Sequence, residues 1–241
     1  AIAIMPMHVA ITPNRTISAS TTLSIRYRME SVVYRLLFVN TVAYGKGALF
    51  NMTTKTIDLS KTDWIEAGFQ ALITSGPTAV SVEPLARQLG VTKGSFYWHF
   101  KNRTMLHEEM LNHWETVSTE RIIELVESTG GTAREKLEQL VGFALHASPG
   151  KYGGARAEGV LRAWAASSER ARKMLARIDK RRRAYLTKLF KEAGLEVPAA
   201  RHAADIVYLA SIGAQTARST GHTIDHLSTW DHLLDRLLEQ T

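Results

Sequence analysis

Hydrogen-bonding, cationic and aromatic side chains gather in one short segment of this sequence, residues 92–101. If the segment is a helix, its outward face carries Lys93, Ser95, Trp98 and His99. Phe96 and Phe100 are four residues apart and therefore lie together on the opposite face. Small donors beside a cation can bond base edges and phosphates in a major groove. The segment therefore predicts non-covalent recognition of double-stranded DNA.

Two stretches before this segment have the end signals of helices that could position it. Ser60 is a predicted N-cap with Asp63 three residues later, which is close to a capping box. Ser81 can cap a second helix, and Gly90 supplies the left-handed residue that a sharp turn needs. Thr92 then caps the third helix. The pattern predicts a helix-turn-helix, and the alternative is a plain small helical bundle.

The same stretch resembles the DNA-binding domain of the tetracycline-repressor (TetR) family. The resemblance rests on Ala67 and Phe69 in the first helix, residues 82–91 as the second helix and turn, and TKGSFYWHFKNRTML from Thr92 onward. Its most specific part is the aromatic pair followed by His-Phe-Lys. The family implies an all-α fold, with an N-terminal three-helix helix-turn-helix DNA-binding domain and a C-terminal helical ligand-binding and dimerisation domain.

The resemblance also implies which residues contact DNA. The groove would receive Thr92, Lys93, Gly94 and Ser95, with Lys93 and Ser95 touching bases. The phosphate backbone would be held by Ser81, Tyr97, Trp98, His99 and Lys101. One small helix makes few base contacts, and each good one gives only about 1 to 3 kcal/mol of discrimination. We therefore expect a homodimer whose two recognition helices enter successive major grooves, about 34 Å apart, on a palindromic operator.

Longer predicted helices follow residue 101 and complete an all-α chain. They cover residues 102–127, a stretch beginning at residue 132, a short helix at 160–166, and residues 169–192, 198–220 and 228–239. The predicted organisation is an atypical extension over residues 1–51, the helix-turn-helix domain over 52–101 and the helical domain over 102–241.

The resemblance assigns two further roles to this helical domain. A small-molecule effector would bind there and release the DNA, and its candidate contacts are large or polar residues on inward faces: Trp114, Phe143, His146, Trp164, Tyr208 and Gln215. The last two helices would pair with their copies in a second subunit. The candidate interface is a set of small and apolar residues: Ala203, Val207, Ala210, Ala214, Ala217, Trp230, Leu234 and Leu237. For both sets the alternative is an ordinary place in the core of one chain.

Residues 1–51 do not fit this pattern. Their only acid is Glu30, and their charges and apolar stretch lack the order of a secretory signal. Met52 opens a sequence typical of the arm that precedes the first helix in the family. We expect Met52 to be the biological start, with translated upstream or vector-derived sequence before it. The alternative is a genuine basic arm that contacts phosphates through Arg15, Arg26, Arg28 and Arg35.

The composition is that of a soluble globular protein. Apolar residues make up 45% of the chain and charged residues 22%, and the net charge of +7 gives faint support to a polyanionic partner. There is no cysteine, which fits a cytoplasmic protein. No apolar run approaches the roughly 18 residues of a membrane span, so we expect no membrane association.

Enzymatic or metal chemistry has little support in the sequence. His107 and His113 are six residues apart, which places them on nearly opposite faces of a helix, and His222 follows a glycine that puts it in a loop. The sequence has no nucleophile elbow, phosphate loop or dinucleotide fingerprint. We therefore expect no catalytic residue, no metal and no cofactor. The remaining alternative is a non-specific nucleic-acid-binding protein of the nucleoid type, which would show no preference for a palindrome.

Overall fold

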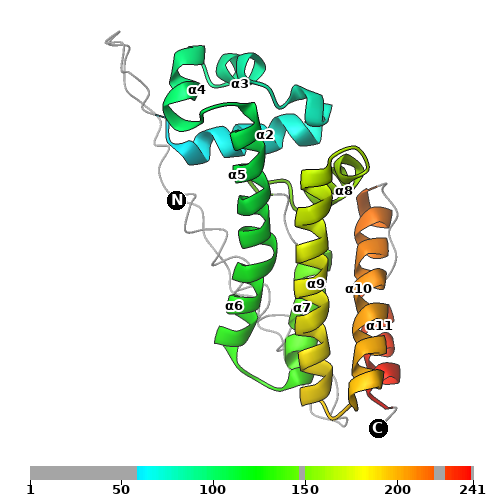
Figure 1. Cartoon of the computed structure of the whole chain (residues 1–241). Coiled ribbons are helices and arrows are strands. Elements are labelled where there is room, and N and C mark those ends of the chain that lie inside the picture. The colour runs from blue at the N-terminus through cyan, green and yellow to red at the C-terminus, as the bar shows by residue number, and fades with distance from the viewer. Residues whose placement is uncertain (1–58, 147–149, 220–225, 240–241) are drawn as a thin grey trace, which may run out of the picture. The chain divides into compact units, whose positions relative to one another are not determined.

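The computed structural model describes residues 59–146, 150–219 and 226–239, and within these ranges the chain is built from helices without a β-strand (Figure 1). The elements are α2 (Lys61–Ser75), η1 (Pro77–Ala79), α3 (Val82–Gln88), α4 (Lys93–His99), α5 (Arg103–Glu115), η2 (Thr116–Glu120), α6 (Arg121–Thr129), α7 (Ala133–His146), α8 (Gly154–Ala165), α9 (Glu169–Glu192), α10 (Val197–Ser219) and α11 (His226–Leu238). The predicted all-α class is confirmed. The predicted extension over residues 1–51 lies outside the described residues.

The first helix begins and ends where its sequence signals predicted. Ser60 Oγ accepts a hydrogen bond from the Asp63 amide at 3.3 Å, and Asp63 Oδ2 accepts one from the Ser60 amide at 2.7 Å. This reciprocal pair is the predicted capping box of α2. Gly76 ends the helix with φ of 79°, a conformation that favours glycine, and donates its amide proton to the Leu72 carbonyl.

The turn between α3 and α4 also has the predicted form, except at its two caps. Gly90 has φ of 69°, and the Val91 amide donates to the Ala86 carbonyl at 3.0 Å across the turn. Ser81 and Thr92 are the N-cap residues of α3 and α4, but neither hydroxyl makes a capping hydrogen bond. Their carbonyls accept the first backbone hydrogen bonds of each helix, as at any N-cap, but the predicted hydroxyl caps are wrong.

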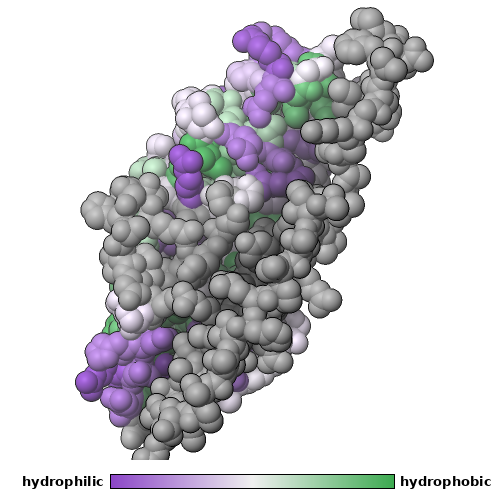
Figure 2. All heavy atoms as spheres, turned by 180° about the vertical axis from the view of Figure 1, so that it is seen from behind, coloured by the Kyte–Doolittle hydropathy of each residue, from purple (hydrophilic) through white to green (hydrophobic). Residues whose placement is uncertain are grey.

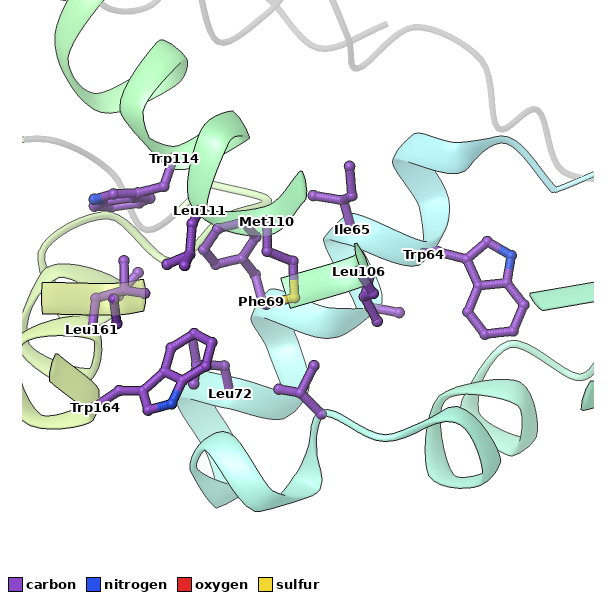
Figure 3. Close-up of a cluster of buried hydrophobic side chains, with 14 of the residues drawn as sticks. Trp64, Ile65, Phe69, Leu72, Leu106, Met110, Leu111, Trp114, Leu161 and Trp164 are labelled. Atoms are coloured by element: carbon purple, nitrogen blue, oxygen red, sulfur yellow. The ribbon is translucent and has the colours of Figure 1, made fainter. Parts of the chain in front are cut away.

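One hydrophobic core runs from the three N-terminal helices into the helices beyond residue 101 (Figure 3). Trp64 and Phe69 of α2 are fully buried, and each contacts an aromatic ring of another element. Trp64 lies 5.3 Å from Phe96 of α4 between ring centroids, and Phe69 lies 5.8 Å from Trp114 of α5. The helices on either side of residue 101 therefore share one set of buried side chains.

A second core cluster joins the helices of the bundle that lies away from α2, α3 and α4. Its buried residues come from α6, α7, α9, α10 and α11, with Phe190, Ala204 and Leu234 among the most fully enclosed. Seen from behind, hydrophilic residues gather near both ends of the picture, and hydrophobic ones show in smaller areas (Figure 2). None of the helices in the described ranges combines the length and the apolar character needed to cross a bilayer.

The helix predicted around residues 160–166 is longer than expected, because α8 begins at Gly154. The preceding turn reverses at Gly153, whose φ is 83°, and a methyl group in place of its hydrogen would lie 2.0 Å from Ile73 Cδ1 of α2. Lys151 in the same turn binds Glu66 of α2 at 3.1 Å, and its carbonyl accepts from Gln70 at 2.9 Å. Gly153 therefore makes a close contact with α2, and α8 follows it without a break.

The single helix predicted over residues 102–127 is divided into α5, a π-helical turn and α6. The turn η2 contains the i to i−5 hydrogen bond of a π-helix, from the Arg121 amide to the Thr116 carbonyl. Helix α9 runs beside this composite helix, as Figure 1 shows, and ion pairs join the two along their length. These pairs are Arg170–Glu108, Arg177–Glu115, Arg181–Glu120 and Lys188–Glu127.

The last of these pairs gives the fold a predicted sensitivity to acid. Hydrogen bonds from Lys136 and Lys188 lower the pKa of the Glu127 carboxyl to about 2. Its pKa in the unfolded chain is about 4.3, so Glu127 stabilises the fold above that pH, and this stability is lost as pH falls toward the folded value. We expect Glu127→Gln to flatten the fall in urea midpoint between about pH 4.5 and pH 2.

The matched control for this prediction is Glu124→Gln, an exposed site on the same helix. Urea unfolding is followed by circular dichroism at a series of pH values. Wild type and Glu124→Gln should show the full acid-dependent loss. Equal slopes in all three proteins would contradict the role given to Glu127.

Candidate nucleic-acid interface

Helix α4 presents one face to solvent and buries the other. Phe96 and Phe100 are completely enclosed, and their stacked rings lie 5.3 Å apart. The predicted DNA contacts at Thr92, Lys93, Gly94, Tyr97, Trp98 and Lys101 are exposed, and those at Ser81, Ser95 and His99 are half-buried. The structure therefore brings these residues together at one end of the described chain, on α4 and at the start of α3 (Figure 1).

Trp98 is the most exposed large apolar side chain among the described residues, with 89% of its surface accessible. Tyr97 beside it is 60% exposed, although its ring also packs edge-on against Phe96. Large aromatic groups left in water on a rigid helix are typical of binding surfaces. An indole and a phenol here can contact thymine methyl groups, sugars or phosphates.

Lys93, predicted to touch bases, is held by an acid in the preceding helix. Its ammonium lies 2.9 Å from Glu83 of α3, and both side chains are exposed. The hydrogen bond from Lys93 lowers the pKa of the Glu83 carboxyl, which remains ionised at neutral pH. Arg87 is a more distant partner of the same carboxylate, at 3.9 Å. Because the pair is exposed, its free energy is small, and a phosphate or a guanine can compete for Lys93.

A histidine on α5 links the helical domain to the residue before α3. His107 Nε2 lies 3.1 Å from the Val80 carbonyl, and the ring meets Trp164 of α8 edge-on at 5.0 Å. Burial lowers the pKa of His107, so the ring is neutral at neutral pH and donates Nε2–H to the carbonyl. This contact fixes the N-terminus of α3 against α5 and α8.

The six predicted effector contacts do not form one cluster. Trp114 and Trp164 belong to the core shared with the three N-terminal helices, and Figure 3 draws both. Phe143 and Tyr208 belong to the second core cluster. Gln215 is half-buried on α10. The side chain of His146 lies outside the described residues. Tyr208 is the member of this set that meets charged groups.

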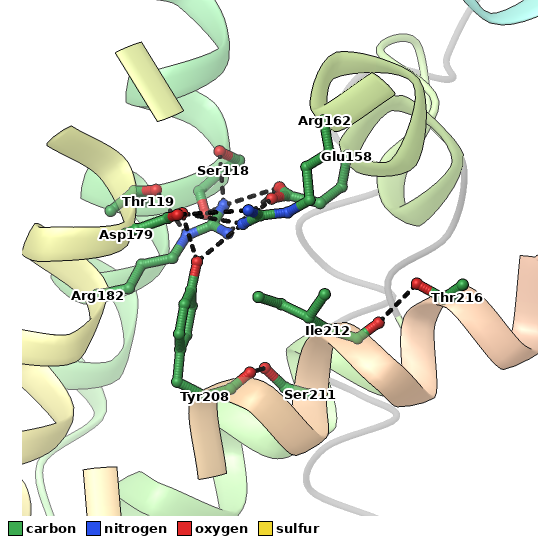
Figure 4. A network of polar contacts seen from close by, with 10 residues as sticks. All are labelled: Ser118, Thr119, Glu158, Arg162, Asp179, Arg182, Tyr208, Ser211, Ile212 and Thr216. Atoms are coloured by element: carbon green, nitrogen blue, oxygen red, sulfur yellow. Dashed lines mark hydrogen bonds and ion pairs between the residues drawn. The ribbon is translucent and has the colours of Figure 1, made fainter. Parts of the chain in front are cut away.

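A polar network surrounds the Tyr208 hydroxyl, and its charged members were not predicted from the sequence (Figure 4). The hydroxyl donates to Asp179 Oδ1 at 2.5 Å and accepts from Arg162 at 2.8 Å. Arg162 also pairs with Asp179 at 2.9 Å and with Glu158 at 2.8 Å. Arg182 pairs with Glu158 at 3.2 Å. The network therefore joins α8, α9 and α10 through two arginines and two carboxylates.

Burial and charge shift the pKa values within this network. Burial, with the hydrogen bond to Asp179, raises the pKa of the Tyr208 phenol to about 12. Burial alone would lower the pKa of Arg162, but the hydrogen bond to Asp179 and the charge of Glu158 outweigh it and raise the pKa. Arg162 thus remains charged in a mostly enclosed setting, where it pairs with two acids.

The cationic run around Arg182 suggests the wrong environment for its side chain. Arg182 belongs to the run of four cations at 180–183, a pattern that ordinarily predicts a solvated helix face. That prediction fits the exposed Lys180 but is wrong for Arg182, whose guanidinium turns inward to Glu158. Arg181 and Arg183 bind Glu120 and Asp205. The three arginines of the run thus have different carboxylate partners, a distinction that composition does not carry.

The predicted dimer residues lie mostly inside the chain. Ala203, Val207, Trp230, Leu234 and Leu237 are at least nine-tenths buried in the second core cluster, and Ala210, Ala214 and Ala217 are half-buried. Side chains already covered by their own chain add little area to a contact with another. The small-residue stripe of α10 packs mainly against α9, α8 and α7 of the same chain. The place of these residues in a dimer interface stays a prediction.

The opposite face of α10 is exposed and partly apolar. Its members His202, Ile206, Leu209 and Gly213 are spaced four, three and four residues apart, and we call them the outer stripe. Ile206 and Leu209 are 46% and 66% exposed.

Metal chemistry has no evident site in the described ranges, where no three His, Asp or Glu side chains are grouped so as to hold an ion.

A tight turn followed by a solvent-facing recognition helix defines a helix-turn-helix protein, here continued by a helical bundle. Residues 65–110 match the sequence profile of the bacterial regulatory proteins of the tetR family. The helix-turn-helix of this chain is thus similar to that of this family of bacterial regulators. No curated protein sequence is similar enough to match the chain.

Solved structures share the fold over most of their length. A transcriptional regulator from Rhodococcus sp. Rha1 is 18% identical with a TM-score of 0.60, covering 76% of this chain and 95% of its own. FadR from Bacillus subtilis, in complex with stearoyl-CoA, is 21% identical with a TM-score of 0.58, covering 74% and 98%. A protein from Saccharomonospora viridis, in complex with choline, is 16% identical with a TM-score of 0.59, covering 74% and 93%. At these identities the likeness establishes the fold.

Proposed function

We propose that the protein is a homodimeric repressor that binds a palindromic operator through α3 and α4 and is released by a small molecule. The observation that carries this proposal is the exposed face of α4 on a helix whose other face is locked into the core. In this proposal Lys93 and Ser95 read bases, while Lys101 and the half-buried His99 hold phosphates. Repression, and action on DNA in the cytoplasm, follow from the family resemblance.

The outer stripe of α10 supports the homodimer. Ile206 and Leu209 form an apolar ridge that lies largely in water on the described part of the chain. Gly213, on the same face, has open space where a side chain would stand, so no close contact within the described chain requires a glycine there. Glycine within a helix costs about 1 kcal/mol relative to alanine, which points to the close approach of another helix. The partner that fits an apolar, self-complementary helix face is a second copy of α10.

Two buried donors support the binding of a small molecule between α5 and α8. Within the described residues, Trp114 Nε1 and Arg162 Nε have no hydrogen-bond partner. Unpaired buried donors are costly and are typically satisfied by a water or a ligand acceptor. We therefore place the effector beside these two groups, next to the polar network. The bound stearoyl-CoA and choline of the two relatives show that related folds hold small molecules.

The effector can release DNA only through different affinities for two conformations of the protein. In the proposed function one conformation holds the two α4 helices at the spacing of successive major grooves, about 34 Å, and the other does not. The second candidate, non-specific nucleic-acid binding, agrees with the net charge of +7 but gives no role to the outer stripe.

Selection of bound genomic fragments with the purified protein, at near-physiological salt, tests the proposal. Such salt weakens contacts that depend on phosphate charge alone. We expect the enriched fragments to share an inverted repeat with half-sites about one or two helical turns apart. Enrichment without a shared motif would overturn the proposal and favour the non-specific alternative.

A further inference from the structure

The π-helical turn η2 changes the register between two parallel helices. Residue numbers rise in the same direction along α5–η2–α6 and along α9, and four ion pairs join the two. Before the turn, Arg170–Glu108 and Arg177–Glu115 join residues 62 apart, whereas after it Arg181–Glu120 and Lys188–Glu127 join residues 61 apart. The composite helix therefore holds one residue more than α9 over the same length, and η2 accommodates it.

Arg182 is the side chain that holds this turn. Its guanidinium donates to Thr119 Oγ1 at 3.0 Å, to Ser118 Oγ at 3.0 Å and to the Ser118 carbonyl at 3.1 Å. A charged group that bonds a backbone carbonyl inside a helix is a recognised cause of local distortion. The same guanidinium donates to Glu158 of α8 at 3.2 Å. Arg182 thus contacts the irregular turn and the polar network at once, as Figure 4 shows.

Helix α5 transmits its direction to the DNA-reading helices. Leu106 and Met110 of α5 are completely buried against α2, and Lys61 of α2 binds Glu109 of α5 at 2.6 Å. The lower part of the composite helix is fixed in the bundle by Ile123 and Val126 of α6. A change of angle at η2 would therefore move α2, α3 and α4 together relative to the bundle.

We propose that Arg182 is the positioning residue that sets the angle of α5, by holding the π-helical turn in place through Ser118 and Thr119. Displacement of Glu158 or Arg162 withdraws Arg182 from the Ser118 carbonyl and lets η2 change its bend. This inference rests on the proposed function for its consequence, because a ligand beside Arg162 would act on DNA through this contact. The structural step itself requires neither ligand nor DNA.

The test compares Arg182→Gln with Arg181→Gln. The two variants lose the same charge at adjacent positions, and Arg181 also contacts η2, but it does so through the exposed Glu120 carboxylate. Amide hydrogen exchange of residues 117–122 reports the turn. Because the chain has no cysteine, spin labels can be placed on Gln88→Cys and Lys191→Cys, two exposed positions on α3 and α9. Labelled chains are diluted with unlabelled protein so that distances within one chain are measured.

We expect Arg182→Gln to speed exchange over residues 117–122 by about tenfold or more and to shift or broaden the distance between the labels. Arg181→Gln should leave both readouts as in the wild type. Operator affinity, measured on the selected DNA, should change in Arg182→Gln alone. If exchange and distance change but no operator exists, the proposed function fails and this inference stands. Equal behaviour of the two variants overturns the inference.

Deletion of Ser118 provides a second, independent test. Removing one residue from η2 gives all four ion pairs the same sequence offset, so an ordinary α-helix can run through. We expect the deletion variant to fold, to hold one narrow label distance, and to show no further change when Arg182→Gln is added. An effect of Arg182→Gln that persists in the deletion background overturns the role of the turn.

Discussion

Replacing Glu158 with alanine is expected to lower the free energy of unfolding by roughly 3 kcal/mol. The Glu158 side chain is only 6% exposed and is shared by Arg162 and Arg182. Its removal leaves two mostly enclosed guanidinium groups, of which Arg162 still pairs with the half-buried Asp179 while Arg182 loses its carboxylate partner. An uncompensated buried charge is far more costly than the loss of an ion pair in water. Urea unfolding followed by circular dichroism measures the change.

The matched control is Glu120→Ala, which removes a carboxylate from the exposed Arg181 pair on the neighbouring turn. Exposed pairs contribute about 0 to 1 kcal/mol, so this variant should remain close to the wild type. Glu158→Gln, which keeps the volume and an acceptor, should fall between the two alanine variants. If Glu158→Ala proves no less stable than Glu120→Ala, the network is not a buried charge cluster.

Replacing Leu209 with arginine is expected to convert the proposed dimer to a monomer and to weaken operator binding by at least about a hundredfold. Leu209 is 66% exposed, so an arginine side chain there can keep its charge in water in the isolated chain. Across a two-fold axis, however, the change brings two like charges together in an apolar contact. Sedimentation velocity measures the mass, and titration of labelled operator measures the affinity.

Val197→Arg is the control for that substitution. It introduces the same charge at an exposed aliphatic residue on the same helix, but at the first residue of α10 and away from the outer stripe. It should leave both mass and affinity near wild-type values. A Leu209→Arg protein that stays dimeric would show that the subunits meet through another face.

The helix-turn-helix could be predicted from sequence because its signals are local. A capping pair at Ser60 and Asp63, a left-handed Gly90 and the aromatic spacing of Phe96 and Phe100 each act within a few residues. Local hydrogen bonds and steric limits decide such features before tertiary packing does. The predicted ends of α9 agree with the structure for the same reason, because Ser168 caps its first turn and Gly194 lies just beyond its last residue.

The features that sequence did not reveal depend on partners distant in the chain. An apolar stripe on α10 predicts burial but does not say whether the same chain or another covers it, and here Ala203 and Val207 are covered internally. No residue pattern marks the π-helical turn in the sequence, because the turn accommodates the one-residue difference in register between this helix and α9. The inward turn of Arg182 likewise depends on Glu158, which lies on another helix.

The core that crosses residue 101 also limits how this protein can diversify. Trp64, Phe69 and Phe96 are packed in one core with side chains of α5 and α8. The DNA-reading helices are therefore not a separate domain that recombination could exchange between relatives. The exposed residues of α4 other than Tyr97, whose ring packs against Phe96, take no part in that packing and can vary one at a time. New operator preferences should therefore arise through point substitutions on a conserved scaffold, while whole-domain shuffling would require matching changes in α5 and α8.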